Sequence, residues 1–148
     1  MSSSTSFEHV QPMDPAQRAL MDILSSARRP DGYCCTVVDF TAAEEFRRRR
    51  VEQTGVPITL IDMTLRSLAL TAGQNPPMLS LVDGYTVHKS GSVDIGCSVA
   101  TDTPISPVVV FREADKLSLE EIHLQRVEMT REAMQEQEKR MAELSRIT

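Results

Sequence analysis

Aromatic residues are scarce in this sequence, which has no tryptophan, two tyrosines and four phenylalanines. A hydrophobic core must therefore be built from Leu, Ile, Val and Met. No stretch approaches the roughly 18 consecutive apolar residues of a membrane-spanning helix. The N-terminal MSSSTSFEHV has no basic region followed by an apolar run, so a secretory signal is not predicted. A basic excess is also missing, because the net charge is −5 with a pI near 5.2, which argues against a nucleic-acid or membrane-surface binder.

Cysteine is also rare, with an odd count of three: Cys34, Cys35 and Cys97. Two of them are adjacent, and an odd number fits no disulfide framework. A reducing, cytoplasmic location is therefore expected. No Cys/His spacing typical of zinc is present, and neither a P-loop nor a G-x-G-x-x-G motif occurs. We therefore expect no permanently bound metal or cofactor.

What the sequence does contain is a set of capping signatures, each followed by apolar residues at helical spacing. The signatures are DPAQ at 14–17, TAAE at 41–44, TLID at 59–62 and SLEE at 118–121. They predict helices over roughly 15–29, 41–54, 59–72 and 118–145. Gly55 and Gly73 are expected to cap the second and third helices. The third is expected to be the most buried, because apolar residues cover most of its circumference.

Strand patterns lie between the helices. Residues 33–40 are rich in Val, Thr and aromatic residues and predict a strand that is buried on both faces. Residues 78–81 and 85–89 predict a hairpin around Asp83-Gly84. Residues 93–100 alternate with period two, and 108–111 are apolar. Together these patterns predict one mixed-sheet α/β sandwich over residues 13–148, preceded by a disordered tail over residues 1–12.

A catalytic site cannot be recognised from the sequence pattern, because no nucleophile, base and orienting group stand at a characteristic spacing. His9 lies in the expected tail, His123 is expected on a helix surface, and His88 near a turn is expected to be structural. The adjacent cysteines 34–35 are expected to pack in the core. The four arginines 47–50 spread around a helix and are expected to form a solvated face.

Residues 87–122, VHKSGSVDIGCSVATDTPISPVVVFREADKLSLEEI, carry a family resemblance. This segment resembles the catalytic domain of the 2-oxoacid dehydrogenase E2 acyltransferases. The corresponding sequence in that family is typically YHK-x-VNIG-x-AVATPDGLVVPV, followed by I-x-x-AD-x-x-SLAEI. The matching pieces are His88-Lys89, Val93, Ile95-Gly96, Val99-Ala100-Thr101, Pro107-Val108, Ala114-Asp115, Ser118-Leu119 and Glu121-Ile122. Residues 59–72 are similar to the family's LTLNDFLVKAVALAL helix and 38–44 to its EVDVTALL segment. The loop 101–106 is one residue shorter and lacks the usual glycine.

The resemblance implies a chloramphenicol-acetyltransferase-like α/β sandwich, usually assembled as a trimer. It implies acyl transfer between a coenzyme A thioester and a thiol or hydroxyl acceptor, with acyl-CoA as co-substrate. By the same resemblance, the segment after the first helix lies toward the acceptor channel. The channel candidates are Tyr33, Cys35 and His88. Neither nucleic acid nor a membrane is an expected partner.

The family's general base is a His in an HRVVDG-like motif, and a hydroxyl residue in a TFTISNLG-like strand stabilises the oxyanion. Neither motif occurs in these 148 residues, so no catalytic residue is assigned. We expect the chain to correspond to the family's N-terminal half, truncated before its catalytic half. One hypothesis is half of a split acyltransferase that needs a partner for the catalytic His. The alternatives are a non-catalytic interaction or assembly protein, an enzyme with chemistry relocated to His88 or a cysteine, and a truncated reading frame.

Overall fold

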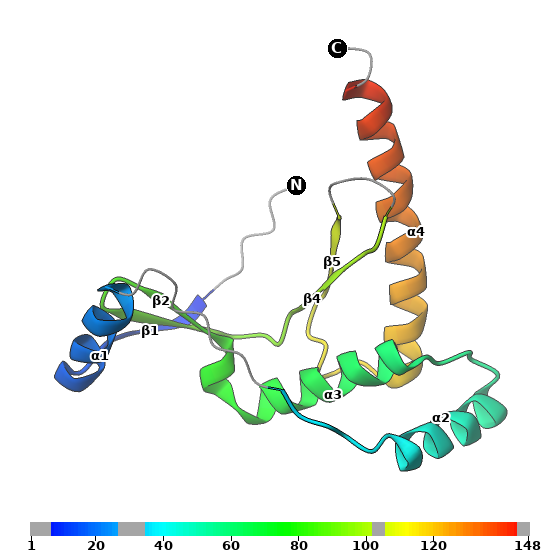
Figure 1. Ribbon diagram of the computed structural model, residues 1–148, viewed down its shortest axis with the longest axis horizontal. Helices are drawn as coiled ribbons and strands as arrows, with labels where there is room; N and C mark the ends of the chain where they lie inside the picture. Colours follow the sequence, from blue (N-terminus) through cyan, green and yellow to red (C-terminus); the bar gives the residue numbers. More distant parts are fainter. Residues whose placement is uncertain (1–6, 27–34, 102–105, 145–148) are drawn as a thin grey trace. The chain divides into compact units, whose positions relative to one another are not determined.

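The computed structural model describes residues 7–26, 35–101 and 106–144 (Figure 1). The chain forms two compact units. One consists of Met1–Phe40 with Asn75–Ser92, and the other of Thr41–Gln74 with Val93–Thr148. Each unit combines helices with a small antiparallel sheet, so the chain is a mixed α/β protein.

A three-stranded sheet forms the centre of the first unit, in the order β1 (Phe7–Pro12), β3 (Thr86–Ser90), β2 (Ser80–Asp83). A single 3₁₀ turn, η1 (Pro76–Leu79), leads into β2. The predicted hairpin is present, and its two-residue loop is Gly84-Tyr85. Gly84 has a positive φ of 55°, which glycine adopts without the steric penalty that other residues meet.

The expected disordered tail over residues 1–12 is wrong for Phe7–Pro12, which forms strand β1. This strand pairs antiparallel with β3, with Val10 opposite His88 and Pro12 opposite Thr86. The partner strand lies far along the sequence, so the composition of residues 7–12 could not predict that they pair with it. Residues 1–6 lie outside the described residues.

Helix α1 (Pro15–Ser26) begins with the predicted capping box. The Asp14 amide donates to Gln17 Oε1 at 3.0 Å, and the Gln17 amide donates to Asp14 Oδ1 at 2.9 Å. The hairpin loop holds the helix, because the Tyr85 hydroxyl donates to Asp22 Oδ1 at 2.6 Å and the Met13 amide donates to the Tyr85 carbonyl at 2.9 Å. These contacts attach the residue before α1 and the middle of the helix to the hairpin loop.

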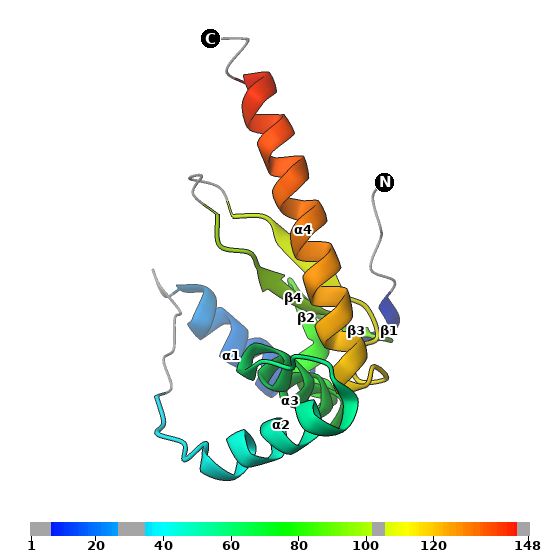
Figure 2. The same cartoon turned by 90° about the vertical axis from the view of Figure 1, so that its right-hand side faces the viewer.

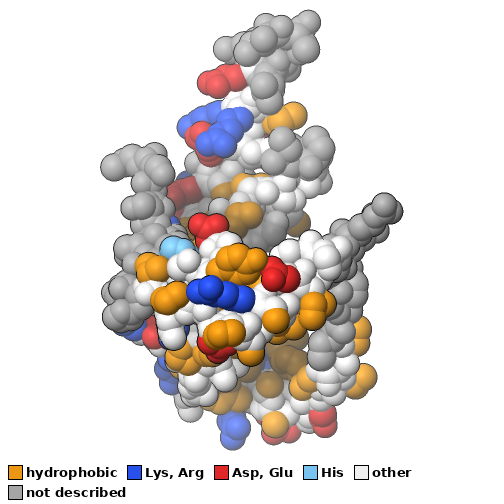
Figure 3. All heavy atoms as spheres, turned by 90° about the vertical axis from the view of Figure 1, so that its left-hand side faces the viewer, with side chains coloured by type: hydrophobic (Ala, Val, Ile, Leu, Met, Phe, Trp, Pro, Cys, Tyr) orange, Lys and Arg blue, Asp and Glu red, His pale blue; other side chains and the backbone are white. Residues whose placement is uncertain are grey.

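The apolar stripe of α1 is nevertheless exposed at Leu20, Ile23 and Leu24. Figure 3 shows hydrophobic side chains gathered on this side of the molecule, interrupted by single basic and acidic groups. The periodicity of the sequence therefore identified the helix correctly, while its apolar stripe faces solvent in the isolated chain.

The strand predicted over residues 33–40 is wrong where the structure describes it. Residues 35–40 have no regular structure, and Val37 is fully exposed while Val38 is 60% exposed. A β-propensity pattern forms a strand only when a neighbouring strand accepts its hydrogen bonds. Within the described residues, neither sheet includes this segment.

The second unit contains α2 (Thr41–Thr54), α3 (Leu60–Gln74), the sheet β4 (Ile95–Ser98) and β5 (Val108–Phe111), and α4 (Leu119–Leu144). Helix α4 packs on α3 and β5, and its C-terminal part extends past both of them (Figures 1 and 2). The apolar core of this unit consists of Ile58, Leu65, Ala69, Ala72, Val93, Ile95, Val99, Val109, Phe111, Ala114 and Ile122.

Helix α3 starts as predicted but ends later. Gly73 is not its cap, because the helix continues to Gln74. A Cβ added to Gly73 would lie 3.6 Å from the Asp115 Cβ and 3.7 Å from Val93 Cγ2, which are ordinary van der Waals distances, so packing does not require a glycine here. The helix is not buried around most of its circumference, because Ile61, Leu68 and Leu70 are exposed.

Gly55 follows α2 in the left-handed conformation predicted for it, with φ of 71°. We expect Gly55→Ala to lower the free energy of unfolding by about 1 kcal/mol, because an L-residue is strained at this φ. An added Cβ would meet nothing within 4 Å, so a clash does not contribute. Urea denaturation measures the loss. Gly55→Asn is the control and should lose less, because Asn tolerates this conformation; equal losses would contradict the explanation.

Among the described residues, no helix combines the length and the apolar character needed to cross a membrane.

Candidate functional site

The three channel candidates fall in different environments. Tyr33 lies outside the described residues. Cys35 is an exposed free thiol in the irregular segment 35–40, so the expectation that it packs in the core is wrong, while Cys34 lies outside the described residues. His88 is half-buried in the central strand β3, between Val10 of β1 and Leu81 of β2. Their predicted place in an acceptor channel remains a prediction.

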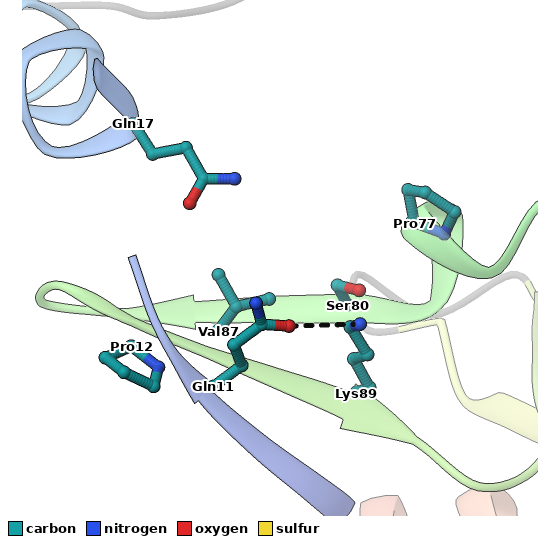
Figure 4. A pocket seen from close by; sticks show the side chains of 7 residues that line it. All are labelled: Gln11, Pro12, Gln17, Pro77, Ser80, Val87 and Lys89. Carbon is teal, nitrogen blue, oxygen red and sulfur yellow. Dashed lines mark hydrogen bonds between the residues drawn. The ribbon is translucent and has the colours of Figure 1, made fainter. Parts of the chain in front are cut away.

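A cavity of about 270 Å³ lies on the sheet of the first unit (Figure 4). Its floor comes from the strands, and Gln17 of α1 and Pro77 of η1 stand beside it. The lining residues are Gln11, Pro12, Gln17, Pro77, Ser80, Val87 and Lys89. Successive side chains of a strand point to opposite faces. Val87 and Lys89 therefore face the cavity, while His88 between them faces away.

Several polar groups of this cavity can donate hydrogen bonds. Lys89 Nζ donates to Gln11 Oε1 at 3.3 Å, and Gln17 Oε1 accepts from the Asp14 amide. Both glutamines use their oxygens in these bonds, and the nitrogens of their amides are turned toward the cavity (Figure 4). Lys89 is the one charged residue of the lining. The sequence offered a weak signal for this site, since the period of β3 places Val87 and Lys89 on one face.

A second polar cluster is buried in the other unit and joins α3 to α4. Asp62 is 0% exposed. Its Oδ2 accepts from the amide and hydroxyl of Thr59, each at 2.8 Å. His123 Nδ1 lies 2.8 Å from the same oxygen, and Arg126 Nε donates to Asp62 Oδ1 at 2.5 Å. One carboxylate therefore caps its own helix and binds two cationic or polar side chains of a distant helix.

The expectation that His123 decorates the surface is wrong, because this side chain is buried at 6% exposure. It follows the fully buried Ile122 and lies one helical turn after Leu119. The neighbouring glutamates suggested a solvated face, but the face that contacts α3 is decided by tertiary packing. The capping signature TLID was the available hint, because it placed an acidic residue at the start of an apolar helix.

Burial alone would raise the pKa of Asp62, but the hydrogen bonds from Arg126, His123 and Thr59 outweigh it and lower the pKa to about 2. The carboxylate is therefore ionised throughout the neutral range. An ionised carboxylate only accepts hydrogen bonds, so His123 Nδ1 carries a proton that it donates to Asp62. All these groups are occupied with one another, which indicates a structural role.

Three of the four arginines 47–50 contact protein groups. Arg47 binds the Glu44 carboxylate and the Ile58 carbonyl, the latter at 2.9 Å. Arg48 Nε lies 3.1 Å from Glu44 Oε1, and Arg50 Nε lies 2.5 Å from Glu120 Oε1. The expected solvated face is thus partly wrong, because these bonds connect α2 to its own first turn, to the following loop and to α4.

Among residues 7–26, 35–101 and 106–144, no three or more His, Cys, Asp or Glu side chains are grouped so that they could hold a metal ion.

Comparisons with known proteins identify the family of this chain. The profile of the 2-oxoacid dehydrogenases acyltransferase (catalytic domain) family matches residues 5–146. A crystal structure of a probable dihydrolipoamide acetyltransferase from Listeria monocytogenes 4b F2365 superposes with a TM-score of 0.61 at 19% identity. The match covers 83% of this chain and 55% of that chain. A search among curated proteins found no match.

The structural similarity confirms the predicted fold, a mixed α/β domain of the kind found in acyltransferase catalytic domains. At 19% identity this similarity concerns the fold alone. The sequence profile extends over nearly the whole chain and includes strand β1. The chain therefore belongs to the family of 2-oxoacid dehydrogenase acyltransferase catalytic domains.

Proposed function

We propose that the chain takes part in acyl transfer between a coenzyme A thioester and a thiol or hydroxyl acceptor. The observation that carries this proposal is the family match over residues 5–146. Acyl transfer of this kind requires a base that deprotonates the acceptor and donors aimed at the developing oxyanion. We further propose that a complementing polypeptide segment with an H-x-x-x-D-G motif supplies the base.

Exposed apolar surface on both units supports the need for a complementing partner. In the first unit these side chains include Leu20, Ile23 and Leu24 of α1. In the second unit Val108 is 61% exposed and Val110 is 38% exposed, on one face of strand β5. Exposed apolar surface and open strand edges are commonly covered by other protein in stable assemblies. A homotrimer is the assembly that the family resemblance implies, and it is compatible with such covering.

Co-expression with a partner that carries the family's H-x-x-x-D-G segment tests the proposal. We expect the two polypeptides to copurify and to release free coenzyme A thiol from acetyl-CoA when a dithiol acceptor is present. Each polypeptide alone should be inactive, and replacing the partner's motif His by Ala should abolish turnover while leaving the complex intact.

The outcomes separate the two functional readings. A complex without turnover would favour the alternative, a non-catalytic interaction or assembly protein that retains the fold. Absence of both complex and turnover would refute the split-enzyme proposal.

A further inference from the structure

We propose that the cavity beside Lys89 binds the anionic end of a small ligand, either a carboxylate or a phosphate. The first reason is the polarity of the cavity. Lys89 brings an ammonium group, and the amide nitrogens of Gln11 and Gln17 are turned into the same space (Figure 4). Charge-assisted hydrogen bonds to an anion are stronger than those between neutral groups. A site of donors and one cation thus selects an anionic acceptor.

The second reason is the absence of a competing carboxylate in the lining. None of the seven residues that surround the cavity is an Asp or Glu. Lys89 donates to the neutral Gln11 Oε1 at 3.3 Å, a contact that leaves its charge uncompensated by an acidic partner in the lining. In a protein of net charge −5, a cavity whose single charge is positive differs from the average surface, and an anionic ligand would complete its ion pair.

The third reason is that the donors are held by regular structure. Lys89 and Ser80 are directly opposite each other in the antiparallel pair β2–β3, and Gln11 is opposite Val87 in β1–β3. Gln17 is fixed by the capping box with Asp14. The strand register and the capping box therefore fix the positions from which these side chains extend, and this brings their donors to one cavity before the ligand arrives.

The remaining lining restricts the body of the ligand. Val87 in the floor and Pro12 and Pro77 at the sides are apolar. The volume of about 270 Å³ lies at the small end of ligand cavities. A ligand with one terminal anionic group and a short uncharged body fits this combination. The proposal does not depend on the acyl-transfer function, since it rests on the cavity alone.

Titration of the ¹⁵N-labelled full chain with sodium phosphate, and separately with sodium acetate, tests the proposal by NMR at constant ionic strength. We expect saturable chemical-shift changes centred on the amides of Gln11, Gln17, Ser80 and Lys89 for at least one of the two anions. The anion that saturates identifies the ligand group as phosphate or carboxylate. Lys89→Gln should weaken binding about tenfold or more, because a hydrogen bond to a charged group is lost.

Two further variants make the test specific. Gln17→Glu keeps the capping box, which accepts either residue. It places a negative charge at the cavity, so it should abolish anion binding. Lys116→Gln removes an exposed lysine of the other unit, which pairs with Glu113, and should bind as the unaltered chain does. Shifts that do not saturate, or equal binding by Lys89→Gln and the unaltered chain, would overturn the proposal.

Discussion

Replacing Asp62 by asparagine is expected to lower the free energy of unfolding by roughly 3–5 kcal/mol, the cost of removing one partner from a buried ion pair. Asp62 is fully buried and accepts from Arg126 Nε at 2.5 Å and from His123 Nδ1 at 2.8 Å. An asparagine of the same shape keeps the oxygen that Thr59 and His123 contact but turns its amide NH2 toward Arg126. The guanidinium, whose side chain is 18% exposed, would lose its counter-ion. Urea denaturation at neutral pH measures the difference.

The same carboxylate should produce a pH dependence in the acid range. Its folded-state pKa of about 2 lies below the ordinary value of 3.8. The stabilisation from Asp62 is therefore fully present above about pH 4 and is lost as pH falls toward 2. Linkage gives a contribution of about 2 kcal/mol. The difference in unfolding free energy between the unaltered chain and Asp62→Asn should shrink over this interval, and a constant difference would contradict the assignment.

Glu121 provides a matched control for Asp62. It occupies the equivalent capping position of α4, where its Oε2 accepts from the Ser118 amide at 2.7 Å, but it is exposed. Glu121→Gln should cost at most about 1 kcal/mol, because a glutamine also serves in a capping box. If both substitutions had the same effect, Asp62 would be acting only as a cap, and its contacts with α4 would contribute nothing.

Truncating Phe111 to alanine is expected to lower the free energy of unfolding by roughly 3–5 kcal/mol. Phe111 is 1% exposed at the end of β5, in a strand whose buried residues alternate with exposed ones. The substitution removes the whole ring and leaves a cavity in the core that α4 covers. Denaturant unfolding followed by circular dichroism gives the value, and Phe111→Leu should show a smaller loss if the alanine variant is too unstable to measure.

Val110 is the control for Phe111, because it lies next to it on the opposite face of β5 and is 38% exposed. Val110→Ala should cost less than about 1 kcal/mol, since most of the lost side chain was not packed. Equal losses at the two positions would show that both faces of β5 are buried in solution. Such a result would itself indicate that another copy or a partner covers the sheet.

Features that depend on neighbouring residues in the sequence were predicted well. The capping boxes at Asp14, Thr59 and Ser118 all form reciprocal hydrogen bonds. The strand Val108–Phe111 also occurs where the sequence places it, and the hairpin β2–β3 forms with its loop one residue after the predicted Asp83-Gly84. In each case the partner groups lie only a few residues apart, so side-chain chemistry and spacing are sufficient to specify the local structure.

Features whose partners lie far along the chain were missed. Strand β1 needs β3, whose residues come about 78 positions later. His123 appeared to be a surface residue because its buried partner, Asp62, belongs to a different helix. The irregular segment 35–40 shows the opposite error, since its composition favours a strand but no described strand pairs with it.

The sequence by itself determined the family, the order of most helices and strands, and where the helices begin, because motifs and caps are short-range patterns. Only the tertiary structure decided which side chains share a site. It brought Lys89, Gln11 and Gln17 around one cavity and buried Asp62 against His123 and Arg126. The physical reason is that burial and electrostatic partners depend on which faces of distant helices and strands pack together. Periodicity in the sequence identifies the apolar face of an element, but it does not identify the element that packs on that face.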